Sequence, residues 1–180
     1  MGYSTEFTGR FLLNKPLDEE TYSFLVKLNE TRRMARRLGP EYGVEGELYV
    51  DGGGEFGQDQ ESSIIDYNRP PSTQPSLWCK WRPSEDRLGI EWDGVEKFYC
   101  YREWLKYITD NFLTPKGYTL SGVVEYQGED SDDHGWIDGS RPLDILLTEP
   151  SQTVQTDPVA GTPLPEPRAP GRKIIWEKET

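Results

Sequence analysis

The sequence has few of the residues that most catalytic and metal sites use. It holds one histidine, His134, and two cysteines, Cys79 and Cys100, in 180 residues. A serine–histidine or cysteine–histidine catalytic unit would have to use His134, which lies in a polar, aspartate-rich segment. Neither cysteine lies in a pattern typical of an activated thiol, and their separation does not fit a redox pair or a zinc site. We therefore do not expect nucleophilic catalysis, a metal or a cofactor.

Long apolar runs are also missing. No stretch approaches the roughly 18 apolar residues of a membrane span, and the N-terminal MGYSTEFTGR has no signal-peptide core. Two widely spaced cysteines fit a reducing compartment. These absences predict a cytoplasmic protein with no membrane contact.

Basic residues are scarce relative to acidic ones. The chain has 20 Lys and Arg against 32 Asp and Glu, a net charge of −12. Residues 141–180 carry six acids and five bases, so −11 of that charge falls on residues 1–140. A field of this sign repels phosphate backbones. Direct nucleic-acid binding is therefore not expected, and a basic or nucleic-acid-binding protein is the expected partner.

Residues 141–180 differ in composition from the rest. They hold seven of the 14 prolines and have no sustained apolar period. Such a segment buries too little surface to offset the entropy of ordering it. We predict a single domain over residues 1–140 and a mostly disordered tail over 141–180.

Aromatic residues are abundant, and alternation and helical periodicity predict the elements of the domain. Residues 3–13 alternate with Phe7 and Phe11 on the apolar face, and Asp18 suits a helix N-cap. The predicted order is strand 3–13, helix 18–37, strand 46–50, a long glycine-rich loop, a hairpin from 77–82 and 88–92, helix 98–112, strand 118–127 and a strand from 136.

This order predicts an α+β fold, a two-layer sandwich in which two amphipathic helices cover a mainly antiparallel sheet. A ferredoxin-like arrangement with an inserted hairpin is one way to connect it. Trp78 and Trp81 fall on opposite faces of the first hairpin strand, so we expect Trp81 in the core and Trp78 at the surface or in a second packing layer.

Two further patterns have a structural and a functional interpretation. The four arginines Arg32, Arg33, Arg36 and Arg37 form the one dense basic patch. They are expected to complement the dipole of the helix end, or to contact an anion or acidic partner. The spacing of Asp130, Asp132 and His134 imitates the start of a calcium loop, but position 12 of that loop would be Arg141. A solvated turn fits this segment better than a cation site.

Residues 59–82 contain the richest candidate site. Asp59 lies at its start, and Asp66, Tyr67, Asn68 and Arg69 are consecutive and offer an acceptor, a phenol, an amide and a fork of donors. Such residues bind a small polar ligand or a protein, or they satisfy their own loop. In the binding interpretation Asp66 is an acid or base, Arg69 an anion clamp and Trp78 or Trp81 a stacking wall.

Several blocks resemble a family of small proteins found in bacteria and their phages. They are GYSTEFTGRFLLNKPL, NETRRM, GQD, SIIDYNRPPSTQPSLWCKW, EWDGVEKFYCYREWLKYI and GYTLSGVVEYQGED, and they span residues 2–136. The resemblance implies one compact domain and a prokaryotic or phage source, with no catalytic residues to carry over.

Three functions follow from these observations. The strongly negative charge, with no recognisable set of catalytic residues, favours an acidic, non-enzymatic protein-binding module, such as a phage or mobile-element inhibitor of a host defence enzyme. The alternative is an enzyme that binds a small ligand or nucleotide with the loop 59–82. A third interpretation is an accessory domain tethered to its partner through KIIWEK, residues 173–178.

Overall fold

The computed structural model describes residues 2–50 and 62–141. The predicted tail beyond Arg141, with KIIWEK, lies outside the described residues. So do Asp59 and the glycine-rich stretch 52–54. Within the described residues, no helix has the length and apolar character that crossing a membrane requires.

The fold contains both helices and antiparallel sheets, as predicted. The α-helices are α1 (Glu19–Glu30) and α2 (Tyr101–Ile108), and a π-helical turn, η4 (Thr109–Leu113), continues α2. The strands are β1 (Thr5–Thr8), β2 (Arg10–Leu13), β3 (Ala35–Arg36), β4 (Ile64–Asp66), β5 (Trp81–Pro83), β6 (Gly89–Trp92), β7 (Leu120–Ser121), β8 (Val123–Gly128) and β9 (His134–Asp138). Short 3-10 helices are η1 (Pro40–Tyr42), η2 (Val44–Gly46) and η5 (Thr114–Lys116).

Four strands and the two helices make the centre of the molecule. The strands lie in the order β5-β6-β2-β7, and every neighbouring pair is antiparallel. Along the chain the elements run β2-α1-β5-β6-α2-β7, so both the chain order and the strand order are those of a ferredoxin-like fold. The predicted hairpin is the β5–β6 pair of this sheet, but its first strand was predicted over 77–82 and begins only at Trp81, so residues 77–80 precede the strand. What is inserted, between α1 and β5, is the two-stranded β3–β4 sheet.

A second sheet, β1-β8-β9, continues the first one around a bend. Gly9 separates β1 from β2 with φ +100°, and Gly122 separates β7 from β8 with φ +91°. Residues 3–13 and 118–127 were each predicted as one strand, and each is two strands in different sheets. Residues other than glycine rarely adopt these backbone angles, which explains why both breaks fall at glycines.

The core is built largely from aromatic side chains. Phe7 makes edge-to-face contacts with Trp81 and Phe98, with ring centroids 5.3 and 5.8 Å apart. Helix α2 adds Trp104 and Leu105, which are fully buried. The predicted apolar faces of the first strand and of the second helix are therefore confirmed. Trp81 is buried as predicted and Trp78 is half-buried.

The first helix is shorter than predicted. It begins after the Asp18 N-cap, which accepts a hydrogen bond from the backbone N–H of Thr21 at 2.7 Å. It ends at Glu30, because Thr31 takes an extended conformation. The following backbone pairs with the later loop: the N–H of Arg33 donates to Leu77 O and the N–H of Ala35 donates to Arg69 O, both at 2.8 Å. This tertiary pairing replaces the last turns of the predicted helix.

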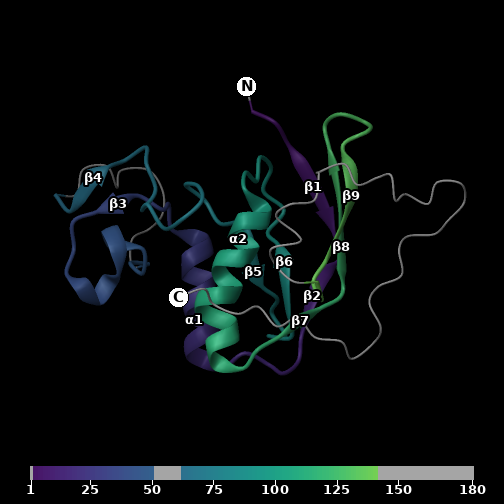
Figure 1. Ribbon diagram of the computed structural model, residues 1–180, viewed down its shortest axis with the longest axis horizontal. Helices are drawn as coiled ribbons and strands as arrows, with labels where there is room; N and C mark the ends of the chain where they lie inside the picture. Colours follow the sequence, from purple (N-terminus) through teal and green to yellow (C-terminus); the bar gives the residue numbers. More distant parts are fainter. Residues whose placement is uncertain (1, 51–61, 142–180) are drawn as a thin grey trace, which may run out of the picture.

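The β3–β4 unit lies on the far side of the helices from β8 and β9 (Figure 1). The predicted strand 46–50 is wrong: this stretch begins within η2 and continues as a turn, with the N–H of Tyr49 donating to Gly46 O at 2.9 Å. Glu45, in η2, has a left-handed backbone with φ 52°. The same loop supplies Glu47, whose backbone carbonyl and carboxylate contact the later loop and α2.

Candidate functional site

A groove of about 350 Å³ lies where the β3–β4 unit meets the β5–β6 hairpin. We call it the basic groove, and its lining residues are Arg32, Pro70, Ser76, Leu77, Trp78, Lys80, Lys97 and Tyr99. Three of the eight are cations and none is acidic. The chain as a whole carries a charge of −12, so a wall of this composition is unlike the rest of the protein.

Arg32 is held in place by groups that leave its charge unneutralised. Its guanidinium carbon lies 4.1 Å from the centre of the Tyr67 ring. Nε donates to the carbonyl of Tyr67 at 3.2 Å, and Nη2 donates to Oδ1 of Asn68 at 3.3 Å. These partners are a ring, a carbonyl and an amide, so none carries a formal negative charge. Two predicted site residues, Tyr67 and Asn68, therefore position a third.

Lys80 and Lys97 approach the groove from the hairpin side. Nζ of Lys80 donates to the backbone carbonyl of Glu96 at 2.5 Å, and burial lowers the pKa of this ammonium. Nζ of Lys97 lies 3.2 Å from a carboxylate oxygen of Glu96. Glu96 thus pairs its carboxylate with Lys97 and its backbone carbonyl with Lys80, while the charges of Asp93 and Glu96 act on Lys80 without forming an ion pair.

The segment that carries Lys97 and Tyr99 has an unusual backbone. Lys97 and Cys100 have φ of 63° and 59°, in the left-handed region that non-glycine residues seldom occupy. Phe98 between them is buried in the core, while the Tyr99 side chain is 48% exposed. The anchored Phe98 holds this strained turn, and the turn directs its neighbours to the groove. Such strain is concentrated at functional sites.

Asp66 and Arg69 have partners of their own. Oδ1 of Asp66 accepts from the backbone N–H of Asn68 at 2.9 Å, which closes a local turn. Arg69 makes two hydrogen bonds of 3.0 Å to the carboxylate of Glu45. These bonds, with one from the backbone N–H of Ser72, lower the pKa of Glu45 to about 2. The loop 62–82 therefore uses Asp66 and Arg69 to fix its own shape and presents Trp78 to the groove.

The four arginines of the basic patch have different surroundings. Arg37 is exposed, Arg32 lines the groove, and Arg33 and Arg36 are buried at 1% and 2% exposure. The helix end predicted for them does not exist. Nε of Arg33 donates to Gln74 Oε1 and its Nη2 donates to Glu47 O, and burial lowers its pKa to about 10. Arg36 stacks on Tyr49.

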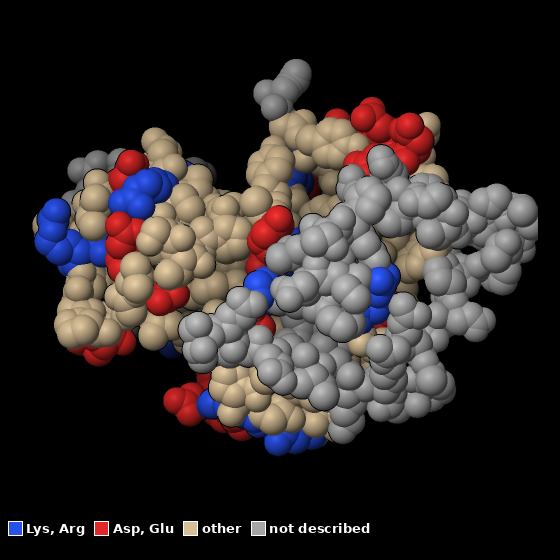
Figure 2. All heavy atoms as spheres, viewed as in Figure 1, with Lys and Arg blue, Asp and Glu red and all other residues tan. Residues whose placement is uncertain are grey.

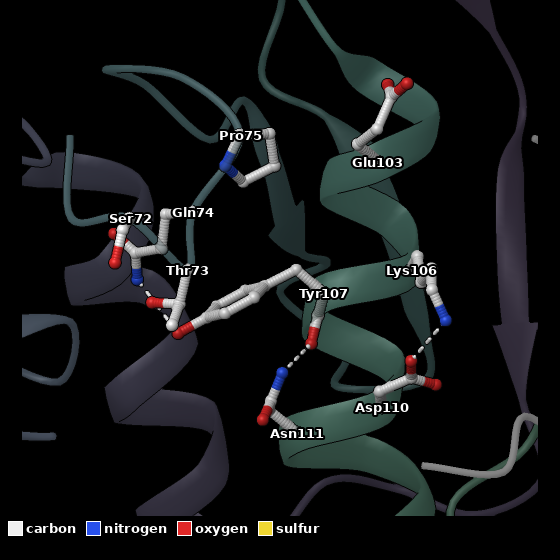
Figure 3. Close-up of a pocket in the computed structure, with 9 residues that line it drawn as sticks. All are labelled: Ser72, Thr73, Gln74, Pro75, Glu103, Lys106, Tyr107, Asp110 and Asn111. Carbon is white, nitrogen blue, oxygen red and sulfur yellow. Dashed lines mark hydrogen bonds and ion pairs between the residues drawn. The ribbon is translucent and has the colours of Figure 1, made fainter. Parts of the chain in front are cut away.

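A second pocket, of about 320 Å³, lies between residues 72–75 of the loop and the helical segment of α2 and η4 (Figure 3). Here Tyr107 from α2 accepts a hydrogen bond from Gln74 Nε2 at 2.9 Å and donates to Oε1 of Glu47 at 2.8 Å. One turn apart along the helix, Nζ of Lys106 lies 2.8 Å from Oδ2 of Asp110 and forms an ion pair with it. The polar groups of this pocket mostly bind one another, so its evident role is to join the loop to α2.

The aspartate-rich segment forms the turn between β8 and β9. Asp130, Asp132 and His134 do not converge, and over residues 2–50 and 62–141 no group of three or more metal-ligating side chains could hold an ion. Asp133 in the same turn accepts a hydrogen bond from the Tyr3 hydroxyl at 2.6 Å. Acidic side chains gather at this end of the molecule (Figure 2).

Sequence reasoning named Arg32 and Trp78 as contact candidates in two separate patterns, and it did not name Lys80, Lys97 or Tyr99. A signal for Lys80 was present, since it alternates onto the same face of the predicted strand as Trp78. The positions of Lys97 and Tyr99 could not be predicted from the sequence, because these residues line the groove through a turn with left-handed backbone angles, and no local sequence pattern predicts that turn.

Comparison with known proteins gives no match: no family model, no curated protein and no solved structure is significantly similar to this chain.

Proposed function

We propose that this chain is a non-enzymatic binding module whose basic groove holds an anionic ligand. The observation that carries the proposal is that Arg32 and Lys80 line one groove and that, within the described part of the chain, neither makes an ion pair with a carboxylate. Cations are outnumbered 20 to 32 in this sequence. Two of them without an ion-paired carboxylate at one concave site favour an anion as the ligand.

The electrostatics of Lys80 support this proposal. Its ammonium is partly buried, and burial disfavours the charged form. An anion that enters the groove restores the lost solvation and stabilises the charge. The guanidinium of Arg32 is charged whether or not an anion is bound, and its contacts with the Tyr67 ring and the Asn68 amide already hold it in place.

Binding without turnover is supported by the groove's lining. None of its eight residues is a carboxylate, histidine or cysteine. The one small hydroxyl, Ser76 Oγ, accepts a hydrogen bond from Trp104 Nε1 at 2.7 Å. It has no base beside it, whereas a nucleophilic serine needs one. The enzyme alternative assigned acid–base and clamp roles to Asp66 and Arg69, and these two residues are engaged in the loop's own structure.

The proposal is tested by calorimetric titration of the full chain with ribose 5-phosphate at low ionic strength. We expect Arg32→Gln and Lys80→Gln each to weaken binding by about tenfold, in line with the loss of a charge-assisted contact. Arg37→Gln removes an exposed charge that does not line the groove, and it should leave the affinity for ribose 5-phosphate unchanged. The proposal fails if the phosphate does not bind, or if all four proteins bind it equally.

A second candidate function rests on the acidic end of the molecule. Glu129, Asp130 and Asp132 are exposed at the β8–β9 turn, at the end of the molecule where acidic side chains gather in Figure 2. They suit a basic partner, such as a nucleic-acid-binding enzyme of a host defence system. Nuclear magnetic resonance shifts on titration with a lysine-rich peptide should map to this turn and disappear in an Asp130→Asn, Asp132→Asn variant. Shifts confined to other surfaces would contradict this function.

The free thiols Cys79 and Cys100 support placing this module in a reducing compartment, the cytoplasm.

A further inference from the structure

We infer that the ligand of the basic groove is a mononucleotide, whose phosphate binds Arg32 and Lys80 and whose base stacks on Trp78. This inference rests on the proposed function and names the class of its ligand. It is carried by a different observation, the state of the two aromatic side chains that share the groove with the cations.

The Trp78 side chain makes neither a hydrogen bond nor a ring contact with the described residues. The core indoles Trp81 and Trp104 and the hairpin indole of Trp92 each donate their Nε1–H, to Tyr101 O, Ser76 Oγ and Val95 O respectively. Among the described residues, Trp78 has no such acceptor and its ring has no aromatic or cation partner. A half-buried indole whose ring and Nε1–H have no partner among the described residues therefore lines the groove.

Tyr99 completes the aromatic wall. Its ring is likewise without a stacking partner in the described part of the chain, and its hydroxyl accepts a hydrogen bond from the backbone N–H of Tyr3 at 3.3 Å. The strained turn through Lys97 and Cys100 keeps it 48% exposed beside the groove. An aromatic face next to cations suits a ligand with a base and a phosphate. Every nucleic-acid base can stack on an aromatic side chain, and the cations can bind the phosphate.

The size and charge of the site favour a single nucleotide over a polymer. A volume of about 350 Å³ is at the small end of the range for small-molecule sites. A net charge of −12 repels every additional phosphate of an oligonucleotide, and likewise the carboxylates of an acidic peptide. A mononucleotide places its few charges against the local cations and its ring against Trp78.

The test compares four probes on the full chain by calorimetry: ribose 5-phosphate, adenosine, adenosine monophosphate and a ten-residue single-stranded oligonucleotide. We expect the monophosphate to bind at least about tenfold more tightly than ribose 5-phosphate or adenosine. A tenfold gain over ribose 5-phosphate is the size expected from one base stacked on an aromatic ring. Trp78→Ala should remove this tenfold advantage, so that the monophosphate and ribose 5-phosphate bind the variant with equal affinity. Tyr99→Ala, at an exposed position, should reduce the advantage in a fold that stays intact.

The outcomes separate this inference from the proposal beneath it. If ribose 5-phosphate binds through Arg32 and Lys80 but the monophosphate binds no more tightly, the ligand carries no base and this inference is overturned while the proposed function stands. Tighter binding of the oligonucleotide overturns it in favour of a single-stranded nucleic acid. If no probe binds, both are overturned. Quenching of indole fluorescence by the monophosphate, absent in Trp78→Phe, places the base on Trp78 independently of affinity.

Discussion

The guanidinium of Arg32 lies over the ring of Tyr67, 4.1 Å from its centre. Arg32 follows the first helix and Tyr67 belongs to the loop after β4, so the contact joins the groove residue Arg32 to that loop. A cation on an aromatic face keeps its full charge for a third partner, which a carboxylate would have neutralised.

This contact predicts the effect of Tyr67→Leu. Without the ring, Arg32 gains freedom that binding must remove, and we expect the affinity for ribose 5-phosphate to fall about threefold, the size of an exposed cation–π contact. Calorimetry on wild type, Tyr67→Leu, Arg32→Gln and the double variant forms a cycle. The substitution at Tyr67 should have no further effect once Arg32 is gone. An equal loss in both backgrounds would show that Tyr67 acts elsewhere.

Glu96 competes with the ligand for Lys97. Its carboxylate lies 3.2 Å from Nζ of Lys97, and an anion bound to Arg32 and Lys80 would also attract this ammonium, which lines the same groove. Glu96→Gln should therefore tighten binding of ribose 5-phosphate by about twofold to fivefold, the range for an exposed ion pair. Glu85→Gln, an exposed acid in the β5–β6 turn, is the matched control for net charge. Weaker binding in Glu96→Gln would rule out competition.

Much of the fold follows from the sequence, for reasons that particular elements make clear. The alternation that buries Phe7 and Phe11 and the apolar face of α2 are local consequences of strand and helix geometry, and both are confirmed. The strand 46–50 and the helix through Arg37 are wrong because local propensity was overridden by pairing with the loop 62–77. The groove was half predictable: Trp78 and Lys80 alternate onto one face, but Arg32 and Tyr99 meet them only in three dimensions.

Tyr107 should be a measurable contributor to stability. Its buried hydroxyl joins Gln74 to Glu47, and burial raises its pKa far above the usual range. We expect Tyr107→Phe to lower the free energy of unfolding by about 1–2 kcal/mol in urea denaturation, because a buried donor and acceptor lose a partner. Tyr99→Phe, at an exposed ring, should cost far less. Equal losses would mean that the network adds nothing to the fold.

The bend between the two sheets depends on Gly122. A Cβ there would lie 3.3 Å from the carbonyl of Arg10 in a backbone with φ +91°. Gly94 has φ +85° but nothing within 4 Å of its Cβ position. Both alanine substitutions should cost about 1–2 kcal/mol for the left-handed backbone, and Gly122→Ala should cost more because it also crowds β2. Equal costs would show that the close approach of the strands is unimportant.

The N-cap of α1 predicts a pH dependence of stability. The backbone N–H of Thr21 and then the hydroxyl of Tyr118 hold the pKa of Asp18 at about 2, below its ordinary value. A lowered pKa means that the unfolded chain binds the proton more readily, so the stabilisation is complete above about pH 4 and is lost as the pH falls toward 2. Asp18→Asn should lower the melting temperature at pH 6 and flatten its fall between pH 4 and pH 2. A variant that follows the wild-type curve throughout would show that this carboxylate contributes nothing.

A crystal structure of the chain with adenosine monophosphate would show whether the basic groove is an anion site. We expect phosphate oxygens within hydrogen-bond distance of Arg32 and Lys80, the base on the Trp78 ring, and the Glu96 carboxylate released from Lys97. A ligand bound at any other place, with Arg32 and Lys80 untouched, would contradict it.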